Sequence, residues 1–290
     1  MSLLTGASLV LPGRDLSASR IAHLLRTERI SVAAGVPTIW HDVVKHVRAH
    51  GGPPGHLREV LTGGSPVPAA LIDDVRTYLG ARVANSWGMT ETLACSTYER
   101  EAPEECAGRP VPLIELRIVD EAGAELPHDG RTSGFLQARG PFVMRGPEPG
   151  GTGWLDTGDV ATLDERGRLR ITDRAKDLIK SGGEWIPSVA LEGHLTAHPA
   201  VRSAAVVAAP DERWMERPCA FVCLEAGQSC TQAELRAHLA SLVPRWWVPD
   251  QIHIVAELPR TSVGKIDKKA LRYWARHGGD RQLCLPDGQH

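Results

Sequence analysis

The order in which strand-like and helix-like segments follow one another changes twice along the 290 residues of this chain. Up to about residue 110, short apolar runs alternate with amphipathic stretches. This alternation predicts a layered α/β fold with largely parallel strands. Ser31 to Val36 is a short apolar run, so we expect a buried strand there, and Pro37 suits the first turn of a helix that runs toward His50.

Two further patterns follow. From about residue 111 to 172, alternating segments separated by turn residues predict short antiparallel strands that form a small barrel. After Asp173, predicted helices at 187–197, 231–242 and 267–276 are mixed with strands, which indicates a small α+β domain. We therefore divide the chain into residues 1–173, residues 174–277 and a tail at 278–290. The apolar opening at 1–11 leads us to expect that further structure precedes it.

The composition excludes several classes of protein. A net charge of -2 gives no overall attraction to nucleic acid. The six cysteines form no Cys-x-x-Cys pair, so neither a zinc ribbon nor a thioredoxin-like site is indicated. His194 and His198 are spaced as a helical pair, but the glutamate of the zinc-protease pattern is missing, so a solvated helix face explains them better. With no membrane-spanning run and no signal segment, we expect a cytoplasmic protein.

Two segments in the first part carry residues suited to a nucleotide. The run 61–68, LTGGSPVP, is a strand that enters a glycine turn, and paired glycines let a backbone approach a ligand closely. An ordinary strand-to-helix turn explains this run equally well. The run 85–92, NSWGMTET, combines an aromatic ring that can stack on a base, a hydroxyl for a phosphate oxygen and a carboxylate for Mg²⁺. A core tryptophan followed by a polar loop is the alternative for this second run.

Two more segments follow in the second half. The runs 153–159, GWLDTGD, and 171–184, ITDRAKDLIKSGGE, place the acid Asp159 where it could bind two ribose hydroxyls, near a change of pattern that suits an interdomain hinge. The run 258–272 contains Gly264 and Lys265, and a lysine on such a loop can deliver a point charge to a phosphate or carboxylate. Taken alone, this last run is explained better by a basic surface loop, and it does not fit a phosphate-binding Walker loop.

In this order, the four segments resemble the adenylate-forming (AMP-binding) family, which includes acyl-CoA synthetases, luciferases and peptide-synthetase adenylation domains. The resemblance runs from about Leu3 to Trp274, and residues 34–40 and 87–91 are most similar to medium- and long-chain fatty-acyl-CoA ligases. It implies a partial adenylation domain, made of βαβ layers and a small antiparallel barrel, followed by a small mobile α+β C-terminal domain. It also implies a ligase that joins a carboxylic acid to CoA through an acyl-adenylate, with ATP and Mg²⁺ required and AMP released.

The resemblance also implies roles for individual residues. Those expected to bind the nucleotide or CoA are Gly64, Ser65, Pro66, Trp87, Asp159, Arg174, Lys180, Gly182 and Gly183. Those expected to act in catalysis are Thr90 on the α-phosphate, Glu91 on Mg²⁺ and Lys265 on the acyl carboxylate. Lys176 matches the hinge about which the small domain swings, and the acyl pocket maps to Val36, Pro37, Thr38 and Trp40.

One expected part of the family pattern is missing from this sequence. Family members carry an upstream Ser/Thr/Gly-rich loop ending in lysine that holds the β- and γ-phosphates, and neither that loop nor the first adenylation subdomain is present. Three interpretations stay open: a ligase whose missing subdomain comes from a separate chain, a half that performs only the thioester step, and an inactive remnant or nucleotide-binding protein. A peptide-synthetase adenylation domain fits less well, because no carrier domain follows Arg272.

Overall fold

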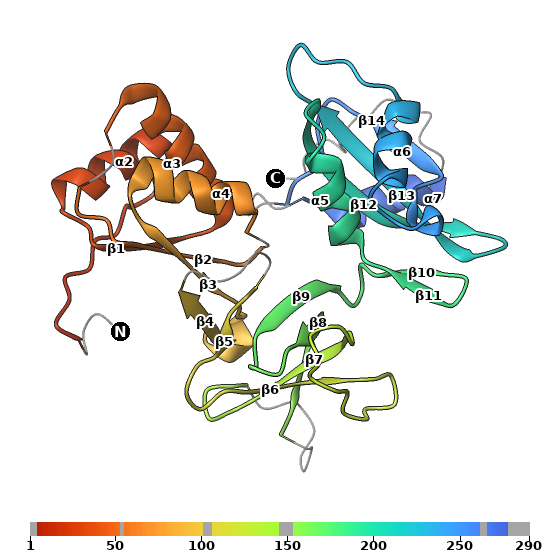
Figure 1. Cartoon of the computed structure of the whole chain (residues 1–290), viewed down its shortest axis with the longest axis horizontal. Coiled ribbons are helices and arrows are strands. Elements are labelled where there is room, and N and C mark those ends of the chain that lie inside the picture. Colours follow the sequence, from red (N-terminus) through yellow and green to blue (C-terminus); the bar gives the residue numbers. More distant parts are fainter. Residues whose placement is uncertain are drawn as a thin grey trace, which may run out of the picture. The chain divides into compact units, whose positions relative to one another are not determined.

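A computed structural model of the chain describes residues 5–52, 55–65, 67–100, 106–144, 153–261 and 266–277. Two compact units divide the chain, residues 1–171 and 172–290, each with its own sheets and core (Figure 1). Of the predicted site residues, Pro66 and Lys265 lie outside the described residues, as does the predicted tail.

The first sheet of unit 1 has the strand order β1-β2-β3-β4-β5. Its parallel strands are β1 (Val32–Gly35), β2 (Glu59–Gly63) and β3 (Arg82–Ser86); β4 (Thr97–Arg100) and β5 (Arg109–Pro110) are antiparallel. The helices are α2 (Ala18–Thr27), α3 (Pro37–His50) and α4 (Ala69–Asp74), which continues into a π-helical turn at Val75–Leu79 (Figure 1). They share one hydrophobic core with the sheet, which confirms the predicted α/β layers.

Strand β1 differs from its prediction. It was expected to be buried, but Val32 is 54% exposed. The reason is its position: β1 is the last strand of the sheet within the described residues and pairs only with β2. At the edge of a sheet the outer backbone groups are unpaired and fewer neighbouring side chains are present to cover those of the strand. Val32 and Ala34, which point to the same face, are both exposed.

The second sheet has the order β6-β7-β8-β9 and takes the place expected for a small barrel. Its strands are β6 (Glu115–Val119), β7 (Gly134–Arg139), β8 (Leu155–Leu163) and β9 (Leu169–Arg174). Side chains alternate between its faces, as the period of a strand requires. Ile118 and Leu136 are buried on one face, and on the other the Trp154 ring is stacked by Arg117 and Arg139, whose guanidinium carbons lie 4.3 and 4.5 Å from the ring centroid.

Unit 2 is the predicted α+β domain. One sheet has the order β11-β10-β13-β12, and β14 pairs with β13. The strands are β10 (Ile179–Ser181), β11 (Glu184–Ile186), β12 (Val201–Asp211), β13 (Met215–Leu224) and β14 (Gln251–Ile254), and the helices are α5 (Ser188–Thr196), α6 (Gln232–Ala240) and α7 (Lys268–His277). Val206 of β12 packs in the core that contains α5 and α6. Its neighbours Ala205 and Val207 pack in the core that contains Leu271 of α7.

Thr231 and Glu234 have the spacing of a capping box, and the structure shows this box at the start of α6. Thr231 Oγ1 accepts the Glu234 N–H at 3.2 Å, and Glu234 accepts the Thr231 N–H at 2.7 Å. We expect Thr231→Ala to lower the free energy of unfolding by about 1 kcal/mol, because a helix N–H loses its acceptor. Urea unfolding of both variants would check this, with Ser229→Ala in the exposed loop before the helix as the control. A Thr231→Ala variant as stable as that control would contradict the capping role.

Candidate functional site

The loop that follows β3 is held closed by hydrogen bonds at its base. The Trp87 N–H donates to Thr97 Oγ1 at 2.7 Å, and the Trp87 carbonyl accepts from the N–H groups of Ser96 and Thr97 at 2.9 and 3.0 Å. Ser96 Oγ also donates to Thr92 Oγ1 at 2.6 Å. These bonds fix a short turn of 3₁₀ helix, Thr90–Thr92, at the loop's tip.

Gly88 allows this loop to close. A Cβ atom at Gly88 would lie 2.0 Å from the carbonyl oxygen of Ala94, so only glycine fits. Leu93 and Ala94 both have positive φ angles, 59° and 67°, which bring that carbonyl back onto Gly88. The glycine of the WGMTE run is therefore required by the packing of the loop on itself.

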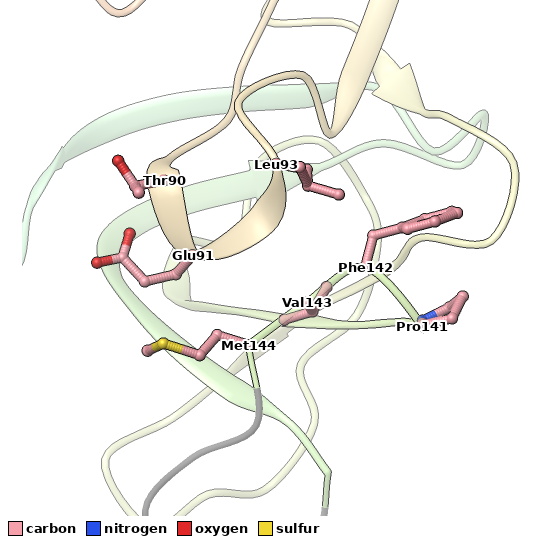
Figure 2. A pocket seen from close by; sticks show the side chains of 7 residues that line it. All are labelled: Thr90, Glu91, Leu93, Pro141, Phe142, Val143 and Met144. Atoms are coloured by element: carbon pink, nitrogen blue, oxygen red, sulfur yellow. The ribbon is translucent and has the colours of Figure 1, made fainter.

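Thr90 and Glu91 line a hollow of about 470 Å³. The other lining residues are Leu93, Pro141, Phe142, Val143 and Met144. The oxygens of Thr90 and Glu91 lie on one side of the loop, away from Pro141 and Phe142 (Figure 2). A hydrogen bond of 2.7 Å from the Met144 N–H to the Glu91 carbonyl ties the two walls together. The hollow therefore has a polar edge and an apolar floor.

Sequence reasoning did not find the apolar wall of this hollow. Phe142 and Met144 are 52% and 54% exposed, and Leu93 is 66% exposed. Nothing local distinguishes residues 141–144 from an ordinary strand-end turn. Their part in the site follows from a backbone contact that joins segments about fifty residues apart.

Glycine is also required at the turn after β2. A Cβ at Gly63 would lie 2.2 Å from the Ser86 carbonyl oxygen of β3, and Gly64 has a φ of 81°. Ser65 follows it and is exposed. The predicted glycine turn is thus present at the carboxyl ends of β2 and β3.

Beside this turn lie two buried polar groups that sequence reasoning missed. Thr62 and Asn85 are register partners on β2 and β3, and each is 3% exposed. Thr62 Oγ1 and Asn85 Oδ1 have no hydrogen-bond partner among the described residues, although Asn85 Nδ2 donates to the Cys106 carbonyl at 2.9 Å. An unpaired buried polar atom is costly, so these two positions are unusual within the sheet. The sequence signal that could have identified them is the polar residue near the end of each apolar strand.

Two residues that were predicted to bind different parts of a nucleotide are in contact. The Trp87 indole N–H donates to Asp159 Oδ2 at 2.8 Å. Asp159 lies on β8 and is 3% exposed, and Trp87 is 8% exposed and belongs to the core beneath the second sheet. The contact joins the second and third sequence motifs within unit 1.

In unit 2, two acids of the predicted hinge segment turn out to be structural. Asp173 is 1% exposed and accepts hydrogen bonds from the N–H groups of Arg174, Ser188 and Val189, so it caps helix α5. Asp177 pairs with Arg272 of α7. A charged cluster of this kind usually lies on a solvated surface. Here the two carboxylates instead attach the segment to helices α5 and α7.

Two cationic residues of this segment, Arg174 and Lys176, are exposed, unlike the two acids. Arg174 ends β9, Lys176 lies within the turn between β9 and β10, and both are exposed. The division of the chain at residues 171 and 172 falls close to Lys176. The hinge role of Lys176 and the ribose role of Arg174 stay predictions.

The Gly182–Gly183 pair forms the turn of the β10–β11 hairpin. Both residues have positive φ angles, 62° and 91°, as a two-residue hairpin turn requires. A Cβ at Gly182 would also lie 2.8 Å from the exposed ring of Trp214. Lys180 Nζ lies 4.2 Å from the centroid of the Trp185 ring.

The residues predicted for the acyl pocket divide into two groups. Trp40 is 2% exposed, packs in the first core and donates its indole N–H to the Gly35 carbonyl at 3.1 Å. Pro37 is also buried, at the first position of α3. Val36 and Thr38 have exposed side chains and stay candidates for an acyl contact.

A magnesium ion at this site would need ligands from both the protein and the substrate. Within the described ranges, no group of three or more His, Cys, Asp and Glu side chains is arranged to hold a metal. Glu91 and the Thr90 hydroxyl offer oxygens, which is the ligand type Mg²⁺ prefers, and Mg²⁺ commonly keeps waters and substrate phosphates as its other ligands. The residues present therefore fit Mg²⁺ bound together with a phosphate.

Comparison with known proteins identifies the class. Residues 1–146 match the family model of the AMP-binding enzymes, and residues 190–265 match that of the AMP-binding enzyme C-terminal domain. The chain belongs to the AMP-binding enzyme family, as the four motifs predicted.

The chain is also similar to curated relatives that are named fatty-acid–CoA ligases. The medium-chain-fatty-acid–CoA ligase of Ectopseudomonas oleovorans is 40% identical over 288 residues, which cover 93% of this chain and 53% of the relative. The long-chain-fatty-acid–CoA ligase of Thermus thermophilus is 38% identical over 305 residues, 95% of this chain and 55% of the relative. The chain thus spans about half the length of the curated relatives it matches.

Solved structures of adenylate-forming enzymes are also similar to this chain. The o-succinylbenzoate CoA synthetase of Bacillus subtilis, in complex with its acyl-adenylate OSB-AMP, superposes with a TM-score of 0.83 at 28% identity over 93% of this chain and 56% of that one. The ATP-bound MatB of Rhodopseudomonas palustris gives a TM-score of 0.81 at 27% identity over 95% and 56%. Within the part of the chain that the structure describes, no helix has the length and apolar character needed to cross a bilayer.

Proposed function

We propose that this chain supplies the C-terminal half of an acid–thiol ligase, which activates a carboxylic acid with ATP and transfers the acyl group to CoA. The observation that carries the proposal is the placement of Thr90 and Glu91, side by side at the edge of a hollow, on a loop that Gly88 and the Trp87–Thr97 bonds hold rigid. Preorganised groups of this kind stabilise charge where a phosphoryl bond breaks. The named activities of the relatives favour a fatty acid as the substrate.

Each residue then has a task that matches its chemistry. Thr90 donates its hydroxyl to a phosphate oxygen, and Glu91 would hold Mg²⁺, which when bound would supply positive charge to the phosphates. Asp159 and Arg174 bind the ribose. Lys265 brings a positive charge to the acyl carboxylate, where it lowers the barrier to attack on the α-phosphate. The β10–β11 hairpin, with its two glycines, borders the path of CoA.

A second candidate keeps only the thioester step. The residues that hold AMP in this scheme are in the chain, while the loop for the β- and γ-phosphates is not. The missing subdomain could come from a separate chain. Among the described residues no strand pairs with the outer edge of β1, and a further strand could add there. An inactive remnant is the third candidate.

The test is a two-arm thioester assay on the purified chain. One arm supplies fatty acids, ATP, Mg²⁺ and CoA; the other supplies preformed acyl-AMP and CoA, and mass spectrometry follows acyl-CoA. Product from acid and ATP supports the proposal, and product from acyl-AMP alone supports the second candidate, which performs only the thioester step. Absence of product in both arms, with Lys265→Ala indistinguishable from the parent, would favour the third candidate, an inactive remnant or a nucleotide-binding protein.

Glu91→Gln gives a sharper test of the metal role. We expect the Kd for ATP in the presence of Mg²⁺ to rise about ten-fold, because the amide keeps the shape of the side chain and loses the charge that binds the cation. The Kd for AMP without Mg²⁺ should stay unchanged. Glu165→Gln, at an exposed turn, is the control, and calorimetric titration measures both constants. Equal weakening of ATP and AMP would argue against a metal role.

A further inference from the structure

We propose that Trp87 is a positioning residue for Asp159: its indole N–H holds the carboxylate in the orientation that binds the ribose hydroxyls. This inference rests on the proposed nucleotide site and adds a determinant of how the sugar is recognised. The resemblance gave Trp87 the base and Asp159 the sugar as separate tasks. Their contact links the two.

The contact is well suited to orient a carboxylate. The Nε1 to Oδ2 distance is 2.8 Å, between side chains that are 8% and 3% exposed. A carboxylate in such surroundings needs donors to offset its lost hydration, and a hydrogen bond to an ionised acceptor is stronger than a neutral one. Tryptophan offers one donor and no acceptor, so the bond can run in only one direction.

The donor itself cannot swing away. Trp87 is fixed through its backbone by Thr97, whose hydroxyl in turn donates to the Ala107 carbonyl. Its ring packs in the same core as Ile114 and Leu136. An indole anchored in this way presents its N–H from a fixed point.

The acceptor is fixed from the strand side. Asp159 lies within β8, where Thr157 Oγ1 donates to the Leu136 carbonyl of β7 at 2.8 Å and accepts the Asp159 N–H at 3.2 Å. The backbone of Asp159 is therefore set by the sheet, and Trp87 holds one oxygen of its carboxylate. With one oxygen oriented, the group meets a ribose diol without first losing rotational freedom.

The substitution Trp87→Phe separates the two tasks. Phenylalanine keeps an aromatic face for the base and deletes the N–H. We expect the Kd for AMP to rise about ten-fold, the size expected for loss of a charge-assisted hydrogen bond. The Kd for an AMP analogue that lacks both ribose hydroxyls should not change. In an Asp159→Asn background, Trp87→Phe should have little further effect on AMP.

The control is Trp154→Phe, a tryptophan of the same unit whose ring stacks between two arginines. Phenylalanine preserves that stacking, so nucleotide affinity should be unchanged. Thermal unfolding of all variants checks that each is folded.

A ligand-free measurement tests the contact itself. In a spectrum of the ¹⁵N-labelled indole groups, the Trp87 signal is the one that Trp87→Phe removes, and we expect Asp159→Asn to shift it more than any other indole signal. If Trp87→Phe does not fold, the same substitution at each of the other tryptophans assigns the Trp87 signal by elimination, and an unshifted Trp87 signal would overturn the proposal. Equal weakening of AMP and the analogue would overturn the positioning role alone. If the parent binds no AMP although the signal shifts, the nucleotide site fails and the positioning role fails with it.

Discussion

Gly88→Ala is expected to destabilise unit 1 by about 3 kcal/mol or more and to remove nucleotide binding. The added Cβ would lie 2.0 Å from the Ala94 carbonyl oxygen, 2.4 Å from its carbon and 2.9 Å from the Cys95 nitrogen. All three are backbone atoms, so no side-chain rotation can relieve the overlap. The loop must open, and Thr90 and Glu91 lose their fixed positions.

Urea unfolding, monitored by tryptophan fluorescence, measures the loss of stability. Calorimetric titration with AMP measures the loss of nucleotide binding. Gly55→Ala is the matched control, because its Cβ would meet no heavy atom within 4 Å. If Gly88→Ala unfolds within about 0.5 kcal/mol of that control, the close approach of Gly88 to Ala94 does not hold the loop.

Lys268→Ala should cost unit 2 about 3 kcal/mol. Lys268 Nζ lies 2.7 Å from Glu192 Oε1 and donates to Ser188 Oγ at 2.7 Å, while Glu192 also accepts the Val206 N–H at 2.8 Å. The two charged side chains are only 17% and 19% exposed. Removing the lysine leaves a carboxylate that is largely out of water and has no counter-ion, which is strongly destabilising.

The cost should depend on pH. Burial raises the pKa of Glu192 above its ordinary 4.5, more than the neighbouring Lys268 ammonium lowers it. An acid with a raised folded-state pKa contributes its stabilisation below its unfolded-state pKa and loses it as the pH rises through the folded value. The penalty for Lys268→Ala should therefore be large at neutral pH and smaller below about pH 4.5.

Two variants complete this test. Lys269→Ala, at the exposed next position of the same helix, should be close to neutral. Adding Glu192→Gln to Lys268→Ala should recover part of the loss, since the amide can still accept from Val206 and carries no charge. Urea midpoints of the four chains at two pH values decide the matter; a pH-independent penalty would mean that lost packing, not the bare carboxylate, is the cause.

A sequence motif can contain both residues that act in the chemistry and residues that only stabilise the fold. Taken alone, the run 258–272 was explained by a basic surface loop, yet Lys268 and Arg272 of this run hold α7 to the rest of unit 2 through Glu192 and Asp177. Only Lys265 of that run has an assigned part in the chemistry. The same division applies to the 171–184 segment, where Asp173 caps a helix.

What the sequence determined by itself was mostly local. Pro37 at the start of α3 was predicted from the sequence, and the spacing of Thr231 and Glu234 is that of a capping box, because each feature depends on atoms a few residues apart. The order of the four motifs identified the family for a similar reason, since each motif is a short run with its own chemistry.

Contacts between distant segments were decided only by the tertiary structure. The wall that Phe142 and Met144 give to the hollow and the bond from Trp87 to Asp159 depend on how sheets and loops pack. The exposure of β1 depends on what pairs with it, and an apolar run cannot tell whether it will be central or at an edge. Residue pattern encodes which face of an element is apolar; which elements meet is settled by the packing of the whole chain.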